Sequence, residues 1–140
     1  MVGVDYVNTF VLVADDASVS HGVEPPIREP NPSTPARQFA MIHAHPYRYT
    51  SGDVIFDVYA DRAGIPLSRR EAARDDYFST GRPCLRASGL GKKYGWGIHC
   101  DEKGRLALYA VESPEYSALV QQGERDGTPA LVKAMRSSRK

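Results

Sequence analysis

Residues 95–111 read GWGIHCDEKGRLALYAV, and this stretch decides the fold that the sequence predicts. Two runs rich in apolar residues, 95–100 and 105–111, flank the polar connection 101–104. The connection ends in Gly104, and a glycine readily adopts the positive φ that a hairpin bulge requires. The stretch therefore predicts a β-hairpin, and with it a sheet.

Two further segments have the composition of strands. Residues 6–13 form a nearly continuous run of β-branched, aromatic and aliphatic side chains, which is typical of a central strand covered on both faces. Residues 130–135 supply a candidate for one more strand near the end of the chain. Residues 15–34 contain four prolines among polar residues, so we expect a long loop there.

The rest of the chain has helical periodicity between recognisable start and stop signals. Two segments begin with an N-cap residue followed by proline, and two begin with capping-box spacing, Thr50 to Asp53 and Ser68 to Glu71. The four predicted helices run from Thr34 to Pro46, from Thr50 to Gly64, from about Arg69 to Ser79, and from Ser113 to near Gly123.

This order of elements favours the α+β class. We expect a small antiparallel sheet of three or four strands, including the hairpin at 95–111, packed on one face by about four helices. Residues 1–135 are expected to form a single domain that contains the proline-rich loop at 15–34, with residues 136–140 as a basic tail.

Composition restricts the classes of function. The chain has 18 basic and 17 acidic side chains, so it lacks the overall positive charge that draws a protein to nucleic acid or to an anionic membrane. No stretch approaches the length of a spanning helix, and the first residues do not resemble a signal peptide. Cys84 and Cys100 are then expected to be reduced thiols in a cytoplasmic protein without membrane association.

The densest chemistry lies in residues 81–100, which read GRPCLRASGLGKKYGWGIHC. Cationic side chains alternate there with glycines, where the backbone can be closely approached, as anion sites require. The candidate ligand-binding residues are Arg86, Ser88, Lys92, Lys93, Tyr94 and Trp96. The alternative is a solvated loop whose glycines serve turns and whose tryptophan packs in the core.

The chain also contains residues of the types found in catalytic thiolate–imidazole pairs and in metal sites. Cys84 and His99 would form a thiolate–imidazole pair if the loop folded back on the hairpin; otherwise both have structural roles. His43 and His45 lack partners at zinc-binding spacing, so no metal site is predicted. The sequence identifies no cofactor and leaves open whether the protein is an enzyme.

Several short runs resemble a known family. They include Tyr6–Phe10, Tyr49–Ser51, Pro83–Ser88, Tyr94–His99 and Lys133–Ser137. On these runs the chain is similar to the bacterial and fungal domain of unknown function family 6157, over nearly all of its length. The resemblance implies the extent of the domain, and it implies no activity, cofactor or site residue.

Three functions remain in competition. The first is binding of a small phosphate- or carboxylate-bearing ligand at the loop and hairpin of residues 81–99. The second is an interaction module for an acidic protein or, less favoured, a nucleic acid, and the third is a structural homo-oligomer. We prefer the first, because guanidinium, amine, aromatic, imidazole and thiol groups gather within about twenty residues, more than a hairpin needs in order to fold.

Overall fold

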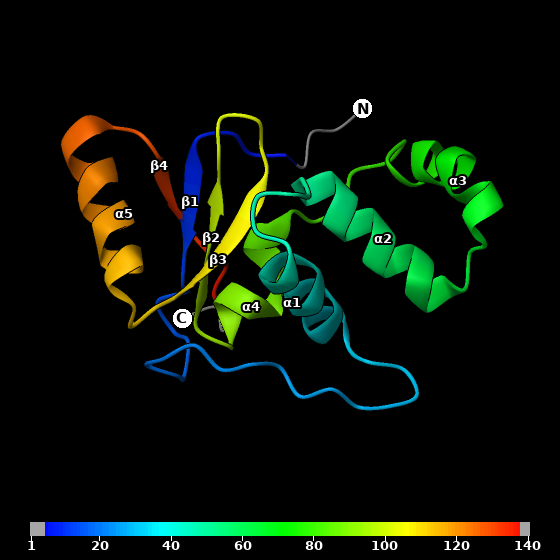
Figure 1. Cartoon of the computed structure of the whole chain (residues 1–140), viewed down its shortest axis with the longest axis horizontal. Coiled ribbons are helices and arrows are strands. Elements are labelled where there is room, and N and C mark those ends of the chain that lie inside the picture. The colour runs from blue at the N-terminus through cyan, green and yellow to red at the C-terminus, as the bar shows by residue number, and fades with distance from the viewer. Residues whose placement is uncertain (1–4, 138–140) are drawn as a thin grey trace.

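A computed structural model describes residues 5–137 and contains a four-stranded sheet (Figure 1). The strands are β1 (Thr9–Leu12), β2 (Trp96–Cys100), β3 (Leu106–Ala110) and β4 (Ala130–Lys133). Their spatial order is β3-β2-β1-β4, so the first strand is central, as its apolar run predicts. Within residues 5–137, no helix has the length and apolar character needed to cross a bilayer.

The predicted hairpin is confirmed. β2 and β3 pair antiparallel, and Gly104 has a φ of +78° in the connection between them. The sheet as a whole is mixed rather than antiparallel, because β4 pairs parallel with β1 while β2 pairs antiparallel with it. The helix that follows β3 carries the chain over the sheet to the far edge, and a crossover of this kind leaves β4 parallel to β3. β1 has the same direction, because β1 and β3 are both antiparallel to β2.

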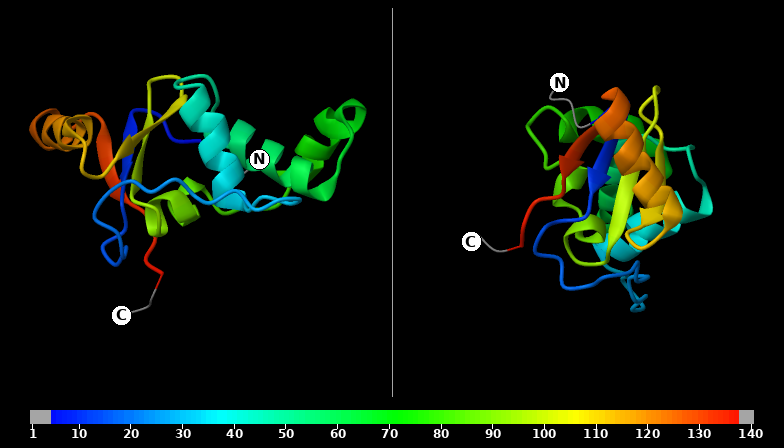
Figure 2. Two further views of the ribbon diagram at one scale, coloured as in Figure 1. Left: turned by 60° about the horizontal axis from the view of Figure 1, so that its bottom comes forward. Right: turned by 90° about the vertical axis from the view of Figure 1, so that its left-hand side faces the viewer.

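The helices confirm the α+β class but cover both faces of the sheet. They are α1 (Thr34–Ala44), α2 (Ser51–Ala63), α3 (Arg70–Tyr77), α4 (Gly89–Lys92) and α5 (Pro114–Asp126), with 3₁₀ turns at Leu67–Arg69 and Leu85–Ala87. Figures 1 and 2 show α5 alone on one side of the sheet, with the other helices opposite it. The expectation that helices pack on one face only is therefore wrong.

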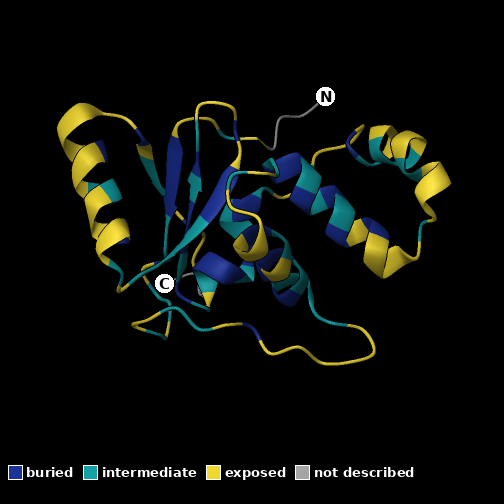
Figure 3. Ribbon diagram, viewed as in Figure 1, coloured by how far each residue is buried: buried dark blue, intermediate teal, exposed yellow. Residues whose placement is uncertain are grey.

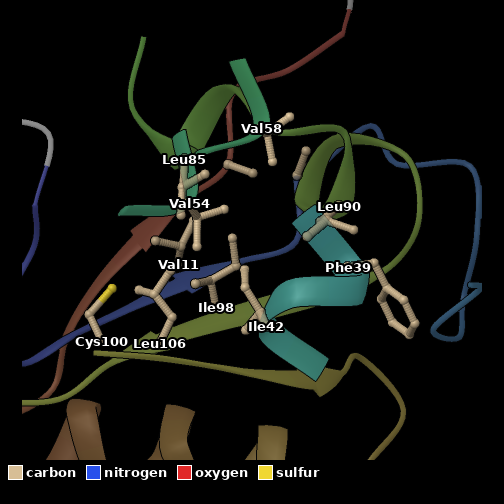
Figure 4. Packing of buried hydrophobic residues seen from close by; sticks show 12 residues of the cluster. Val11, Phe39, Ile42, Val54, Val58, Leu85, Leu90, Ile98, Cys100 and Leu106 are labelled. Carbon is tan, nitrogen blue, oxygen red and sulfur yellow. The ribbon is translucent and has the colours of Figure 1, made fainter. Parts of the chain in front are cut away.

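The larger part of the core lies between the sheet and the layer of α1, α2 and α4 (Figure 4). Val11 and Ile98 project into it from the two central strands. The buried members of this cluster are Val11, Ala14, Phe39, Ile42, Val54, Val58, Leu85, Leu90, Ile98, Cys100, Leu106 and Ala134. Successive residues on a strand point to opposite faces of the sheet. Phe10 and Gly97 are the immediate neighbours of Val11 and Ile98, so they face the other way, toward α5.

The α5 face is closed by aromatic packing. Phe10 is fully buried, and its ring meets that of Tyr116 edge-on, with the ring centres 4.9 Å apart. Gly97 lies beneath both rings: a Cβ there would come within 2.6 Å of Phe10 Cζ and 2.7 Å of Tyr116 Cε2. Contact between α5 and the sheet therefore depends on a residue without a side chain.

Local signals predict some helix ends and miss others. Thr50 and Asp53 form the expected capping box, whereas Ser68 makes no capping bond, because a 3₁₀ turn precedes α3 and shifts its start to Arg70. α5 continues past Gly123 to Asp126 and ends at Gly127, whose φ is +74°. Gly123 is buried because Leu131 and the Pro129 carbonyl pack against it, so it is a packing residue and not a terminator.

The predicted loop between β1 and α1 has no regular structure (Figure 1). It is fixed near its middle, where Val23 N donates to Tyr94 O at 2.8 Å and Val23 O accepts from Trp96 Nε1 at 2.9 Å. Figure 3 shows that much of this loop, α3 and the outer face of α5 are exposed. The described part of the predicted tail, Arg136 and Ser137, is also exposed, and residues 138–140 lie outside the described chain.

Substituting Gly97 by alanine should destabilise the protein. The added methyl group collides with the rings of Phe10 and Tyr116, and overpacking of this kind costs about 1–3 kcal/mol. Urea denaturation should show this loss. Gly81→Ala is the matched control, because a Cβ at Gly81 meets nothing within 4 Å. Equal stability of the two variants would contradict the packing described for α5.

Candidate functional site

A cleft of about 850 Å³ opens on the side of the molecule opposite α5. Its walls come from the start of α1, one face of α2, Tyr77 at the end of α3, and the segment 83–94 that leads to β2. The lining residues are Ser33, Thr34, Pro35, Gln38, Ile55, Val58, Tyr59, Arg62, Ala63, Tyr77, Pro83, Cys84, Leu85, Ala87, Ser88, Gly89, Lys92, Lys93 and Tyr94. Its size is that of a pocket for a small molecule.

A buried hydrogen bond joins two walls of the cleft. Ser88 Oγ donates to Gln38 Oε1 at 2.6 Å and accepts from Leu90 N at 3.1 Å, which caps α4. Gln38 is 5% exposed and Ser88 is 7% exposed, so neither group has ready access to water. Ser88 thereby fixes the position of α4 against α1.

Small residues allow α4 to pack closely on its neighbours. A Cβ at Gly89 would lie 2.8 Å from Pro35 Cγ, and one at Gly91 would lie 2.9 Å from Ala134 Cβ. Leu90 between them is fully buried in the core. The helix is therefore held on three sides, and Lys92 and Lys93 at its end are presented at the cleft.

The lining of the cleft is positively charged. Arg62, Lys92 and Lys93 contribute to it, and no aspartate or glutamate does. Arg62 Nη1 donates to Thr34 Oγ1 at 3.0 Å, which uses one of the five donors of its guanidinium. Among residues 5–137 no carboxylate lies within ion-pair distance of any of the three.

Aromatic side chains form part of the wall. The rings of Tyr59 and Tyr77 lie 4.3 Å apart between centres with an interplanar angle of 31°. Arg82 places its Cζ 3.9 Å from the centre of the Tyr77 ring and donates through Nε to the Tyr77 carbonyl at 2.8 Å. Tyr77 is thus fixed by both neighbours, whereas Tyr59 is 42% exposed.

Cys84 contributes a half-buried thiol to the cleft. Its Sγ lies 3.2 Å from the hydroxyl of Tyr6. Burial raises the pKa of Tyr6, and the neighbouring Cys84 acts in the same direction. The phenol of Tyr6 is therefore neutral near neutral pH.

Two of the predicted ligand residues lie away from the cleft. Arg86 donates through Nε to Lys133 O at 2.7 Å, and its carbonyl accepts from Met135 N at 2.8 Å, so it joins the segment 83–94 to the end of β4. Trp96 packs against Phe39 with 5.1 Å between ring centres and donates to the long loop. Ser88, Lys92, Lys93 and Tyr94 do line the cleft.

His99 lies on the α5 side of the sheet and Cys84 lies on the opposite side. The two side chains form no hydrogen bond with each other. Tyr47 Oη lies 2.8 Å from His99 Nδ1 and 2.8 Å from Tyr109 Oη, and the imidazole meets the Phe10 ring at its edge. Burial lowers the pKa of His99, although Asp101 and Glu102 act in the opposite direction. Burial and the Tyr109 hydroxyl raise the pKa of Tyr47.

Sequence reasoning missed the cleft residues contributed by α2 and α3. Tyr59, Arg62 and Tyr77 are far in sequence from the basic segment, and the fold brings them to it. One signal was available: Tyr59 and Arg62 are three positions apart on a helix and so share a face. Among residues 5–137, no group of three histidine, cysteine, aspartate or glutamate side chains is arranged to hold a metal ion.

Comparison with known proteins identifies the family. The model of a family described as "Family of unknown function (DUF6157)" matches residues 1–140, so the chain belongs to this family, in agreement with the resemblance seen in the sequence. No curated protein and no solved structure matches the chain.

The two thiols should differ in reactivity. Cys84 lines an open cleft, whereas Cys100 is 1% exposed and burial raises its pKa to about 12. A colorimetric thiol reagent at pH 8 should modify one cysteine quickly in the native protein and both after unfolding. Cys84→Ser should abolish the fast phase. A fast phase that survives in this variant would contradict the burial of Cys100.

His99 should make stability dependent on pH. Because its pKa is lower in the folded state, the imidazole contributes stability above its unfolded pKa of about 6.5 and loses it as the pH falls below that value. Urea denaturation should show declining stability from about pH 7.5 to about pH 5.5. His99→Gln should flatten this decline, whereas the exposed His45→Gln should keep it. An unchanged slope in His99→Gln would refute the assignment.

Proposed function

We propose that the cleft between α1, α2 and the segment 83–94 binds a small ligand that carries a phosphate or carboxylate group. The observation that supports this most directly is the charge of the lining, which holds Arg62, Lys92 and Lys93 and no acidic side chain. Cationic side chains around a cleft that has no acidic residue in its lining give it a positive potential, which favours an anionic ligand.

The donors of the cleft suit an anion. Lys92 and Lys93 each carry three N–H groups, and within residues 5–137 neither ammonium group forms a hydrogen bond or ion pair. Arg62 retains N–H groups beyond the one that it donates to Thr34. The amino-terminal end of α1 also borders the cleft, and its macrodipole favours negative charge there.

The residues of the proposed anion site differ in part from those predicted from the sequence. Ser88, Lys92, Lys93 and Tyr94 remain in the site, and Arg62 joins them from α2. Arg86 and Trp96 leave it, because each is engaged in holding the fold. We also propose a cytoplasmic location, which suits a protein whose two cysteines, Cys84 and Cys100, are unpaired.

Removing the two lysines should weaken anion binding. We expect phenyl phosphate and hexyl phosphate, which share one dianion on different bodies, to bind the wild type in low salt. Lys92→Ala/Lys93→Ala should weaken both by about tenfold or more, because hydrogen bonds to charged groups contribute about 1.5–3 kcal/mol. Isothermal titration calorimetry at about 20 mM and about 150 mM salt measures the effect, and binding should be weaker at the higher salt, where exposed charges are screened.

The matched control is Lys103→Ala, together with an Arg105→Ala change. Both side chains are exposed at the hairpin connection, outside the cleft, and their loss removes the same net charge. This control should bind both phosphates like the wild type. The proposal fails if neither phosphate binds the wild type, or if the control and the cleft variant lose affinity equally.

A further inference from the structure

We infer that the ligand of the cleft carries a flat aromatic ring, which stacks on the tyrosine wall while the cationic side chains hold its anionic group. This inference rests on the proposed function and adds the chemical class of the ligand. Aryl phosphates and aryl carboxylates combine these two parts directly, and nucleoside phosphates combine them through a sugar.

Tyr59 and Tyr77 form an aromatic wall of the cleft. Tyr77 has its ring covered by the Arg82 guanidinium and by Tyr59, at 3.9 Å from Cζ and at 4.3 Å between ring centres. Arg82 also holds the Tyr77 backbone through its Nε. Tyr59 packs on this fixed pair and on Phe56, whose ring centre is 6.1 Å from its own. It is nevertheless 42% exposed, and it lines the cleft. An anchored aromatic side chain with an exposed surface is a platform for another ring.

The shape of the cleft bears on the kind of apolar group that it binds. An aliphatic chain gains free energy in proportion to the area removed from water, so it binds best where protein surrounds it. A flat ring makes its main contact through one face, and a single platform at the side of an open cleft suffices for it. The cleft is open to solvent, and Tyr59 offers such a platform on its α2 wall, which favours a ring over an acyl chain.

The aromatic wall and the cationic side chains lie on the same cleft. Tyr59 and Arg62 are three positions apart on α2, and side chains at this spacing are neighbours on one face of a helix. Lys92 and Lys93 face the same cleft from the end of α4. A ring stacked on Tyr59 therefore has an arginine beside it and two lysines across the cleft, positions suited to a phosphate or carboxylate attached to that ring.

The test compares 1-naphthyl phosphate with octyl phosphate. Both carry the same dianion on a sizeable apolar body, and one body is a flat ring system while the other is a flexible chain. Calorimetry in low salt should show the naphthyl compound binding at least about fivefold more tightly to the wild type. Tyr59→Leu keeps an apolar side chain but removes the ring, and it should reduce this preference to near one. Tyr59→Phe should preserve the preference.

The outcomes separate the two proposals. If both phosphates bind with equal affinity, or if Tyr59→Leu retains the naphthyl preference, the inference about the ring is overturned. Loss of affinity for both compounds in Lys92→Ala/Lys93→Ala would in that case leave the anion site standing. If neither compound binds the wild type, the anion site fails and the ring inference fails with it.

Discussion

The buried hydrogen bond from Ser88 to Gln38 is the interaction on which the cleft depends. It connects α1 with α4 through two residues that are 50 positions apart in the sequence. Both side chains are buried, so each serves as the other's hydrogen-bond partner in place of water. A buried polar group left without a partner costs about 1–3 kcal/mol, so the two walls separate only at a considerable cost. Lys92 and Lys93 owe their position to this contact, because they end the helix that Ser88 begins.

The sheet provides the second constraint, because its central strand is buried on both faces. On one face, Phe10 packs against Tyr116 over the bare backbone of Gly97, and α5 closes that side. On the other face, Val11 lies in a core shared by α1, α2 and α4. The cleft lies where α1, α2 and the segment 83–94 meet.

The sequence predicts those features that arise from neighbouring residues. The hairpin around Gly104, the capping box at Thr50 and the central strand are all local patterns, and the structure contains each of them. The parallel position of β4 could not be predicted in this way, because it depends on the path of α5 across the sheet. Likewise Gly123 reads as a helix terminator in sequence, but Leu131 packs on it in the fold.

The residues of the candidate site likewise divide into those that the sequence predicts and those that only the fold reveals. The basic segment 81–100 contains Ser88, Lys92, Lys93 and Tyr94, and their residue types were sufficient to suggest an anion site. Arg86 has the same chemistry, yet it binds a carbonyl of β4, which only the tertiary structure reveals. Tyr59 and Arg62 enter the site because α2 packs beside the segment, a contact between parts of the chain that no local pattern encodes.

If the proposed function is correct, anions bind in this cleft and not elsewhere on the surface. The most direct measurement is a titration of the isotope-labelled protein with phenyl phosphate, followed by two-dimensional amide spectra in low salt. We expect saturating shifts to concentrate in residues 33–38, 59–63 and 84–94, while α5 and the hairpin connection stay unchanged. Shifts spread over the basic side chains of the whole surface, or concentrated at the hairpin connection, would contradict it.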